Sequence, residues 1–384
     1  MTSSSPTPGT NAGRSRSSNR QAVLGRIQSA GEMGRAQIAR DLGLSTQAVS
    51  NIIAELQQEG FLLETGIRSA GRGLPAVQYG VNPEGGYALG FEIRPDAIFA
   101  ALVDLHGQAI ETERRPLETT EPSIVLNTVV NLRDELLHKS GIQPSRVLGV
   151  GVVIPGPFGE TGLSGLGSDL AGWQQIDAKA LFQEALNLPV ELSNDANAAA
   201  MSERLTQGLS NFAYLYFGAG LGLGLINQGQ LVAGAFGNAG EIGHVPIMTP
   251  NGPSPLELQL SRVAAQRHLA AHGAIDIAAL ERLYVEADPL LMAWLETAGE
   301  ALSQALAIIE NLLDPHSVVL GGAMPEVIID HLVQHTQLPT LSVSNRSDNP
   351  HPRLLRGTCG RLTATLGAAS LILNRAFTPQ AASL

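Results

Sequence analysis

A short segment near the amino terminus carries four polar side chains at the spacing of one helix face. Over residues 49–56, apolar side chains recur at helical spacing and predict the buried face of this helix. Ser45 precedes the run and suits an N-cap. When a helix lies in the DNA major groove, polar groups near its N-terminus contact base edges and phosphates. The segment therefore predicts a DNA-recognition helix, whose exposed face holds Thr46, Gln47, Ser50 and Asn51.

Further helices are needed to hold such a segment against DNA. Residues 20–30 have apolar side chains at helical spacing and end at Gly31, and residues 35–42 repeat the pattern up to Gly43. The order is then helix, tight glycine turn and recognition helix, which is typical of a helix-turn-helix. We include Arg35, at the start of the middle helix, and Ser45 among the candidate DNA contacts.

A Gly/Arg loop follows the recognition helix. Two β-rich runs, residues 61–64 and 76–81, enclose this loop and predict a wing with Arg68 and Arg72 at its tip. Wing arginines contact phosphate or enter the minor groove, where the negative potential is enhanced. The alternative is that both side chains are only solvated. Their position directly after a helix-turn-helix favours DNA contact.

Charge is distributed unevenly along the 384 residues. The whole chain has 24 Lys and Arg against 35 Asp and Glu, a net charge of −11. Residues 1–82 hold eight arginines and five acidic residues, a net charge of +3, so the remainder carries −14. A basic head on an acidic body indicates that only the head meets a polyanion, although an arginine-rich genome and chance would give the same imbalance.

Composition excludes several other classes of protein. Hydrophobic residues make up 44% of the chain, enough for large cores and too many for wholesale disorder. Cys359 is the single cysteine, which excludes an intramolecular disulfide and a cysteine-rich zinc cluster. Residues 1–19 are rich in Ser, Thr, Pro and Gly and lack the apolar core of a signal peptide, so we expect a disordered tail and a cytoplasmic protein. Glycines and amides interrupt the long uncharged stretch at 205–240, so we expect no membrane span.

The body combines buried strands with helices. Residues 88–110 predict two strands around a turn at 94–96, followed by a hairpin at 106–107. Residues 147–158 predict a buried strand that ends in a Pro-Gly-Pro turn. A short strand then leads through residues 194–197 into an alanine-rich helix, and a glycine-punctuated hairpin region runs from 212 to 244.

Six of these segments, in this order, resemble the ROK family of sugar kinases and sugar-responsive repressors. They read VVIPGPF, DLAGW, NDANAAA, FGAGLGLG, GNAGEIGH and NLLDPHSVVLGGA, and the head's GRGLPA is similar to the wing of ROK repressors. The resemblance covers about residues 20–377 and implies an α/β actin-like ATPase fold of two lobes with a sugar cleft between them. The expected organisation is a tail at 1–19, a winged helix-turn-helix at 20–82 and a ROK domain at 83–384. Lobe I would span about 83–195 plus a returning helix at about 362–377, and lobe II about 196–361.

The resemblance also implies a set of sugar-binding residues. Matching positions are Asn194, Asp195, Glu241, His244 and Glu257. Several carboxylates and a histidine in one cleft suit a polyol, because a carboxylate accepts hydrogen bonds from two adjacent hydroxyls. The alternative for the first two residues is that they only cap the helix that follows. Asp169 stands where the family usually has asparagine, a change that removes a donor and adds charge, and which should alter the ligand preference or disfavour a phosphorylated sugar.

The kinase elements of the family are degenerate here. A D-x-G-G-T turn binds nucleotide phosphates in ROK kinases, and the matching residues, 92–96, read Glu-Ile-Arg-Pro-Asp. Both glycines are lost, Pro95 has no N–H to donate, and two acidic side chains oppose a triphosphate. The second phosphate element reads Gly-Ala-Gly at 218–220 and lacks its hydroxyl. We therefore expect no ATP and no catalytic residue in use, although Asp195 matches the kinase general base.

Zinc is also not expected. Many ROK members hold zinc with the histidine of E-x-G-H and three cysteines, and this chain has Met248, Pro250 and Pro255 roughly where the thiolates would lie. His244 thus lacks its metal-binding partners.

The sequence as a whole predicts a sugar-responsive DNA-binding regulator, a repressor, with a catalytically inactive ROK body. Expected partners are operator DNA, a small sugar or sugar derivative and a second copy of the chain, as a homodimer or a dimer of dimers. The alternative is an ATP-dependent sugar kinase that retains a regulatory head. A third hypothesis is a regulator that responds to a protein partner.

Overall fold

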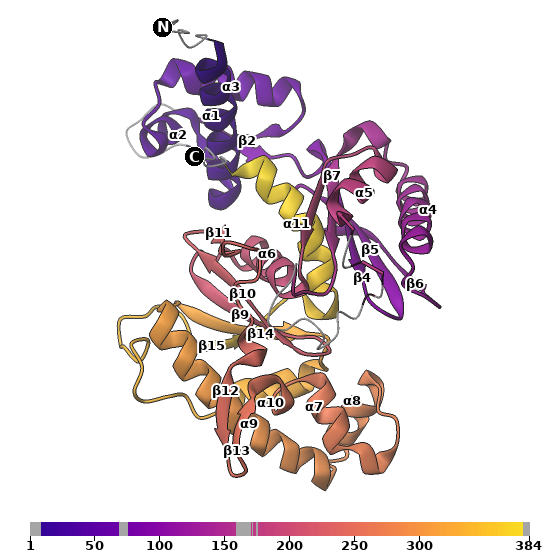
Figure 1. The fold of residues 1–384 in the computed structure, drawn as a ribbon. Coiled ribbons are helices and arrows are strands. Elements are labelled where there is room, and N and C mark those ends of the chain that lie inside the picture. The colour runs from indigo at the N-terminus through magenta and orange to yellow at the C-terminus, as the bar shows by residue number, and fades with distance from the viewer. Residues whose placement is uncertain (1–8, 69–75, 159–169, 171, 174–175, 379–384) are drawn as a thin grey trace, which may run out of the picture.

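Three main sheets, with helices between and around them, form the fold (Figure 1). The computed structural model describes residues 9–68, 76–158, 170, 172–173 and 176–378. No helix in these ranges is long and apolar enough to cross a membrane.

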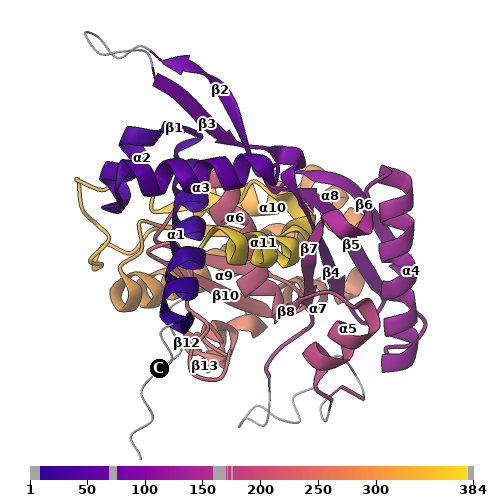
Figure 2. The ribbon, with the colours of Figure 1, turned by 90° about the horizontal axis from the view of Figure 1, so that it is seen from above.

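Residues 9–68 and 76–81 form the predicted winged helix-turn-helix. Gly43, with a φ of 64°, ends α2 in the left-handed conformation and turns the chain toward α3. The wing is a three-stranded antiparallel sheet of order β1-β3-β2, and Figure 2 shows its strands projecting from the rest of the molecule. The elements are α1 (Gly9–Ala30), β1 (Glu32–Gly34), α2 (Arg35–Leu42), α3 (Thr46–Gln58), β2 (Leu62–Arg68) and β3 (Ala76–Val81).

Three details of the head differ from the sequence prediction. Helix α1 begins at Gly9, so residues 9–19 are helical and not part of a disordered tail. Arg16 pairs with Glu55 of α3, and Arg20 pairs with Glu59, the residue after α3. Strand β1 was not predicted, because three residues are too few to show an alternating pattern. Strand β2 continues to Arg68, which pairs with Ala76 inside the hairpin and does not lie at the loop tip.

Lobe I is built on a five-stranded mixed sheet of order β6-β5-β4-β7-β8. The predicted turn and hairpin are confirmed, since β4 pairs antiparallel with β5 and β5 with β6. Helices α4 and α5 contact the sheet and each other on its outer side. The elements are β4 (Tyr87–Ile93), β5 (Ala97–Asp104), β6 (Ala109–Pro116), α4 (Pro122–Ser140), β7 (Val147–Val153), α5 (Ala178–Leu186) and β8 (Val190–Ser193).

Lobe II has a second five-stranded sheet, of order β11-β10-β9-β14-β15. Its largest apolar core lies between this sheet and helices α7 to α10. The elements are β9 (Phe212–Phe217), β10 (Leu221–Asn227), β11 (Gln230–Leu231), β12 (Pro246–Thr249), β13 (Gly252–Pro255), α7 (Arg262–His268), α8 (Ile277–Val285), α9 (Pro289–Leu313), β14 (Ser317–Gly322), α10 (Glu326–His335) and β15 (Leu354–Arg356).

Two helices join the lobes. Helix α6 (Asp195–Gln207) packs on β9 and β10 of lobe II, and α11 (Thr363–Phe377) packs on β4 and β7 of lobe I. The two helices also pack closely against each other, so they lie between the sheets (Figure 1). A Cβ added at Gly367 of α11 would lie 1.8 Å from the Ala198 carbonyl oxygen of α6. The C-terminal helix thus packs on the sheet of lobe I.

The close approach of these helices gives a stability prediction. Alanine normally stabilises a helix interior relative to glycine by about 1 kcal/mol. At Gly367, we expect Gly367→Ala to lower the unfolding free energy by about 1–3 kcal/mol instead, because the helices must separate. Gly299→Ala in α9 is the matched control, since its Cβ would meet only Thr336 Oγ1 at 3.7 Å. Equal thermal midpoints for the two variants would contradict this packing.

The head is packed onto the body through the far end of α11. One apolar cluster contains Val23 and Ile27 of α1 together with Leu373 and Phe377 of α11. Gln21 Nε2 donates a hydrogen bond to the Arg375 carbonyl at 2.9 Å. Figures 1 and 2 both show α1 beside the C-terminal end of α11. A continuous packed path therefore runs from α6 through α11 to the head.

Candidate functional site: an interlobe cleft and a recognition helix

A cleft of about 1270 Å³ lies where the two lobes face each other. Its walls come from the ends of β4 and β7, the start of α6, the turn after β9 and the start of α7. Five of the six predicted sugar-binding residues line it: Asn194, Asp195, Glu241, His244 and Glu257. Asp169 lies outside the described residues, although Leu170 and Trp173 beside it contribute to the wall.

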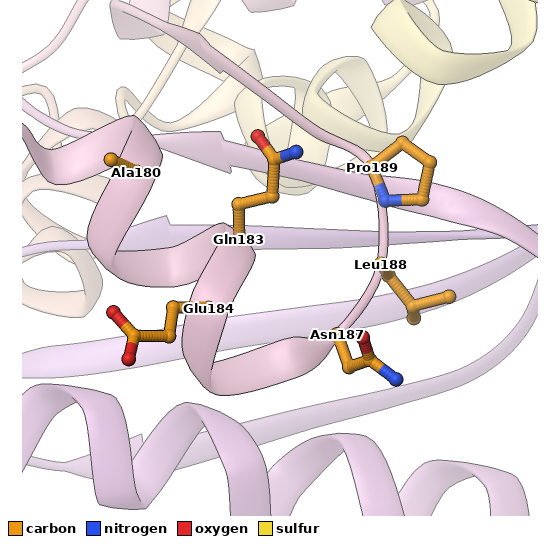
Figure 3. A pocket seen from close by; sticks show the side chains of 6 residues that line it. All are labelled: Ala180, Gln183, Glu184, Asn187, Leu188 and Pro189. Carbon is orange, nitrogen blue, oxygen red and sulfur yellow. The ribbon is translucent and has the colours of Figure 1, made fainter.

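A second hollow, of about 590 Å³, lies on the surface at α5 (Figure 3). Figure 3 shows its six lining residues on one helix and the segment after it, with Glu184 as the single carboxylate among them. None of the predicted site residues lines this hollow, so it is not the candidate site.

Asn194 and Asp195 stand where β8 passes into α6. Asn194 is the N-cap, and its Oδ1 accepts a hydrogen bond from the Asn197 amide at 2.9 Å. Asp195 Oδ1 accepts from the Ala196 amide at 2.8 Å. The other oxygen, Oδ2, lies toward the turn after β9, 3.2 Å from where a Cβ at Gly218 would be. Capping therefore explains Asn194 fully and Asp195 only in part.

The environment of Asp195 is unfavourable to its charge. Burial, followed by the nearby Glu92 carboxylate, raises the pKa of Asp195 from its ordinary 3.8 to about 6. The folded chain consequently binds more protons than the unfolded chain between these two values, and the stability falls as the pH rises through this range. The difference between these two pKa values corresponds to about 3 kcal/mol of unfolding free energy, which solvent in the cleft reduces to about 1–2 kcal/mol.

Because stability falls as Asp195 loses its proton, the effect of Asp195→Asn is predicted to depend on pH. The amide keeps the Oδ1 acceptor and removes the charge, so we expect a higher thermal midpoint than for the unmodified chain at pH 8. The difference should shrink to near zero at pH 4. Asp134→Asn is the control, because that carboxylate is 61% exposed. A constant difference across the pH range would show that the charge of Asp195 is not the cause.

The second group of cleft residues is a histidine between two carboxylates. His244 Nε2 lies 3.8 Å from Glu241 Oε2, and His244 Nδ1 lies 3.8 Å from Glu257 Oε1. Burial raises the pKa of Glu241, opposed by His244 and supported by Glu257. Separations of 3.8 Å are too long for hydrogen bonds, so the three side chains leave their polar atoms for a ligand or water. This group provides several carboxylate acceptors and an imidazole N–H donor, which suits a polyol.

The residues present do not fit zinc. Met248 and Pro255 belong to the β12–β13 hairpin and Pro250 to its turn, and none of the three offers a ligand atom that binds zinc firmly. Within the described ranges, no group of three or more His, Cys, Asp or Glu side chains is arranged to hold a metal ion.

The turn after β4 contains an ion pair that sequence reasoning did not assign to the site. Arg94 Nε donates to Glu92 Oε1 at 2.7 Å, and the guanidinium lies 4.2 Å from the centroid of the Phe99 ring. Glu92 also accepts hydrogen bonds from Thr365 at 2.7 Å and Tyr216 at 3.4 Å. The signal available in the sequence was an acidic residue at the end of an otherwise apolar strand, followed by an arginine.

This turn and the next one are poorly suited to nucleotide phosphates. The Arg94 amide donates to Ala97 O at 2.9 Å, so it is used within the hairpin, and Pro95 has no amide hydrogen. In the turn after β9, the Gly218 amide donates to the Gly220 carbonyl at 3.1 Å, so it is also used within its own turn. The residues therefore do not fit a triphosphate held by backbone amides.

In the head, α3 presents the predicted polar face. Thr46, Gln47 and Asn51 are exposed, Ser50 is half-buried, and Gln47 Nε2 donates to Asn51 Oδ1 at 3.1 Å. Ser45 is the N-cap, accepting from the Ala48 amide at 3.1 Å. The helix is thus anchored by its apolar face, while the amide groups face solvent.

The predicted arginine contacts are positioned differently from one another. Arg35 Nε donates to the hydroxyl of buried Tyr79 in β3 at 2.8 Å, which fixes α2 against the wing. Arg68 ends β2, and Arg72 lies outside the described residues. Arg26 of α1 pairs with Asp41 of α2, so this arginine links two helices of the head.

Comparison with known protein families identifies the family of this chain. A model of the ROK family matches residues 88–375, which is most of the chain and nearly all of both lobes. This chain belongs to the ROK family. Its two-lobed body has the α/β actin-like ATPase fold, preceded by the winged head. The similarity extends to the xylose repressor of Bacillus spizizenii, 25% identical over 378 residues that cover 92% of this chain and 94% of the repressor.

Other ROK proteins differ in how much of the chain they match. The crystal structure of a ROK family transcriptional regulator, a homologue of the Escherichia coli Mlc protein, has a TM-score of 0.73 at 22% identity and covers 95% of this chain and 97% of that one. A glucokinase of Halalkalibacterium halodurans is 24% identical and covers 73% of this chain and 90% of the kinase. The regulators thus match along nearly the whole ROK chain, whereas the kinase matches about three quarters of it.

Proposed function

We propose that this ROK protein is a sugar-responsive DNA-binding repressor whose interlobe cleft senses the sugar without phosphorylating it. The observation that carries the proposal is the presence, in one chain, of an exposed polar face on α3 and a carboxylate-lined cleft. The similarity to a xylose repressor along nearly the full length of both proteins supports it.

The cleft residues divide the recognition of a sugar between the lobes. Asn194 and Asp195 come from the lobe I side of the cleft, at the start of α6, whereas Glu241, His244 and Glu257 come from lobe II. Hydroxyls that bridge the two groups would draw the lobes together, because each charged hydrogen bond contributes about 1.5–3 kcal/mol. A bound sugar thus favours a closed form of the cleft.

The packed path from the cleft to the head supplies the coupling. Asp195 is the first residue of α6, α6 packs on α11, and Phe377 of α11 packs on α1. Closure that moves α6 against α11 would shift the head relative to the body. To lower operator affinity a hundredfold, the sugar must favour the non-binding form by about 2.7 kcal/mol. Two hydrogen bonds made only in the closed form are sufficient for this.

The kinase alternative rests on the retention of Asp195, which matches the general base of ROK kinases. Its raised pKa would suit a base near neutral pH. In the turn at residues 92–96, however, Pro95 has no amide hydrogen and the Arg94 amide is used within the hairpin, and the turn at 218–220 lacks the hydroxyl of the kinase element. We therefore propose that the retained carboxylate binds a sugar hydroxyl and transfers no phosphoryl group.

A ligand panel distinguishes these functions. Thermal midpoints of the full chain are measured with D-xylose, D-glucose, N-acetyl-D-glucosamine and ATP–Mg, and phosphorylation is assayed in parallel. We expect a shift with one or more sugars, no shift with ATP–Mg and no phosphorylated product. ATP-dependent sugar phosphorylation that Asp195→Asn abolishes would establish the kinase instead. Sugar-independent operator binding that a protein partner relieves would favour the third hypothesis.

A further inference from the structure

Two arginines enter the cleft from opposite lobes. Arg94 follows β4 of lobe I, and Arg262 is the first residue of α7 in lobe II. Both line the cleft that holds Asp195 and Glu257. Neither residue was among the predicted ligand contacts, and Arg262 differs from the acidic and amide groups expected for a neutral sugar.

Each arginine has a buried N–H group that lacks a hydrogen-bond partner in the part of the chain that the structure describes. These groups are Nη2 of Arg94 and Nε of Arg262. A buried donor without a partner costs about 1–3 kcal/mol, and more when it carries charge, so native proteins seldom retain two in one place without use. Paired with a ligand atom, both donors would be satisfied.

Carboxylates act on both guanidiniums. Glu92 accepts from Arg94, Thr365 and Tyr216, Asp195 also favours the charge on Arg94, and Asp96 favours the charge on Arg262. Burial opposes the charge on Arg94, yet the Glu92 carboxylate holds its pKa above the ordinary value. Burial lowers the pKa of Arg262, and the positive charge of Arg94 lowers it further. The two guanidiniums therefore repel each other across the cleft. This repulsion disfavours closure of the cleft unless an anion lies between the two side chains.

We propose that Arg94 and Arg262 form an anion subsite, so that the ligand of the cleft is a sugar bearing a carboxylate or a phosphate group. The inference rests on the proposed function, because the sugar hydroxyls would be held by the carboxylate side of the same cleft. Planar guanidiniums suit both kinds of oxyanion, which they bind with paired hydrogen bonds. An anion bridging the lobes also removes the repulsion that opposes closure.

The direct test uses inorganic anions on the full-length chain. Thermal midpoints are measured at constant ionic strength in chloride, phosphate and sulfate for the unmodified protein, Arg262→Gln, Arg262→Lys and Arg282→Gln. Arg282 is an exposed residue of α8 outside the cleft lining and serves as the matched control. We expect phosphate and sulfate to raise the midpoint of the unmodified chain and of Arg282→Gln, to have no such effect on Arg262→Gln and to have a reduced effect on Arg262→Lys. The subsite is overturned if phosphate acts no differently from chloride, or if its effect survives in Arg262→Gln.

Calorimetric titrations then separate the two sources of the anion. The probes are D-glucose, D-glucuronate, D-glucose 6-phosphate, ATP and tripolyphosphate. We expect one of the acidic sugars to bind at least about tenfold more tightly than D-glucose, and Arg262→Gln to remove this preference. The acid that is preferred identifies carboxylate or phosphate as the natural group. Binding of D-glucose that neither acidic group nor Arg262→Gln changes would overturn the subsite and leave the sugar-sensing function standing. ATP binding much tighter than that of tripolyphosphate would identify a nucleotide site and overturn both proposals.

Discussion

Exchange of Gln47 and Asn51 together for alanine is expected to lower operator affinity at least about a hundredfold. Both amides are exposed on α3 near its N-terminus and lie within hydrogen-bond distance of each other. Amide side chains read adenine through paired hydrogen bonds, and each such contact is worth about 1–3 kcal/mol. The losses of binding free energy at the two positions add together, because both side chains face the same groove of the DNA. Stability should change little, since the helix is anchored through Val49, Ile53 and Leu56 on its other face.

The measurement is a titration of a labelled duplex, selected by the unmodified chain from a random-sequence pool. Gln58→Ala is the matched control, because this amide is also exposed on α3 but lies at the opposite end of the helix. The control should retain the unmodified affinity at the same salt concentration. Equal affinity for the double variant and the control would remove α3 as the recognition helix.

Glu241→Ala is expected to weaken sugar binding about a hundredfold and to leave operator binding by the free protein intact. The carboxylate lies in the cleft beside His244 and makes no contact with the head. Loss of an acceptor for two sugar hydroxyls costs up to about 3 kcal/mol. Burial disfavours its charge, so its removal should not destabilise the fold.

Calorimetry with the sugar found in the ligand panel checks this result. The control is Glu296→Ala, an exposed residue of α9 remote from the cleft lining. The operator should remain bound by Glu241→Ala at sugar concentrations that release the unmodified chain. Unchanged sugar affinity would show that the ligand does not contact this group of residues.

The helical and strand elements that position both sites could be predicted from local sequence pattern. The apolar spacing over 49–56, the glycine at 43 and the apolar runs of β4 and β5 each specify one element with little competition. Strand β1 and the amino-terminal part of α1 could not be predicted, because they depend on tertiary partners. Strand β1 exists through pairing with β3, and Arg16 and Arg20 find their acidic partners only once α3 is folded beside them.

The candidate sugar site was predicted through the order of motifs and not through spacing alone. Asn194 and Glu257 are 63 positions apart, and only the fold brings them to one cleft. The arginine pair was missed for the same reason, since Arg94 and Arg262 belong to different lobes; Arg94 stands in the degenerate phosphate turn at 92–96, and Arg262 stands in no recognisable motif. Local sequence patterns predict individual helices and strands. A site formed by residues of two lobes can be recognised only when the tertiary structure is known.

The linkage between sugar and operator tests the central claim most directly. Operator affinity of the full chain is measured by fluorescence anisotropy without sugar and with saturating sugar, and sugar affinity is measured without and with the operator duplex. The account predicts that sugar lowers operator affinity, and that operator lowers sugar affinity by the same factor, because coupling between two binding sites is reciprocal. Tight binding of both ligands with no effect of either on the other would contradict the account.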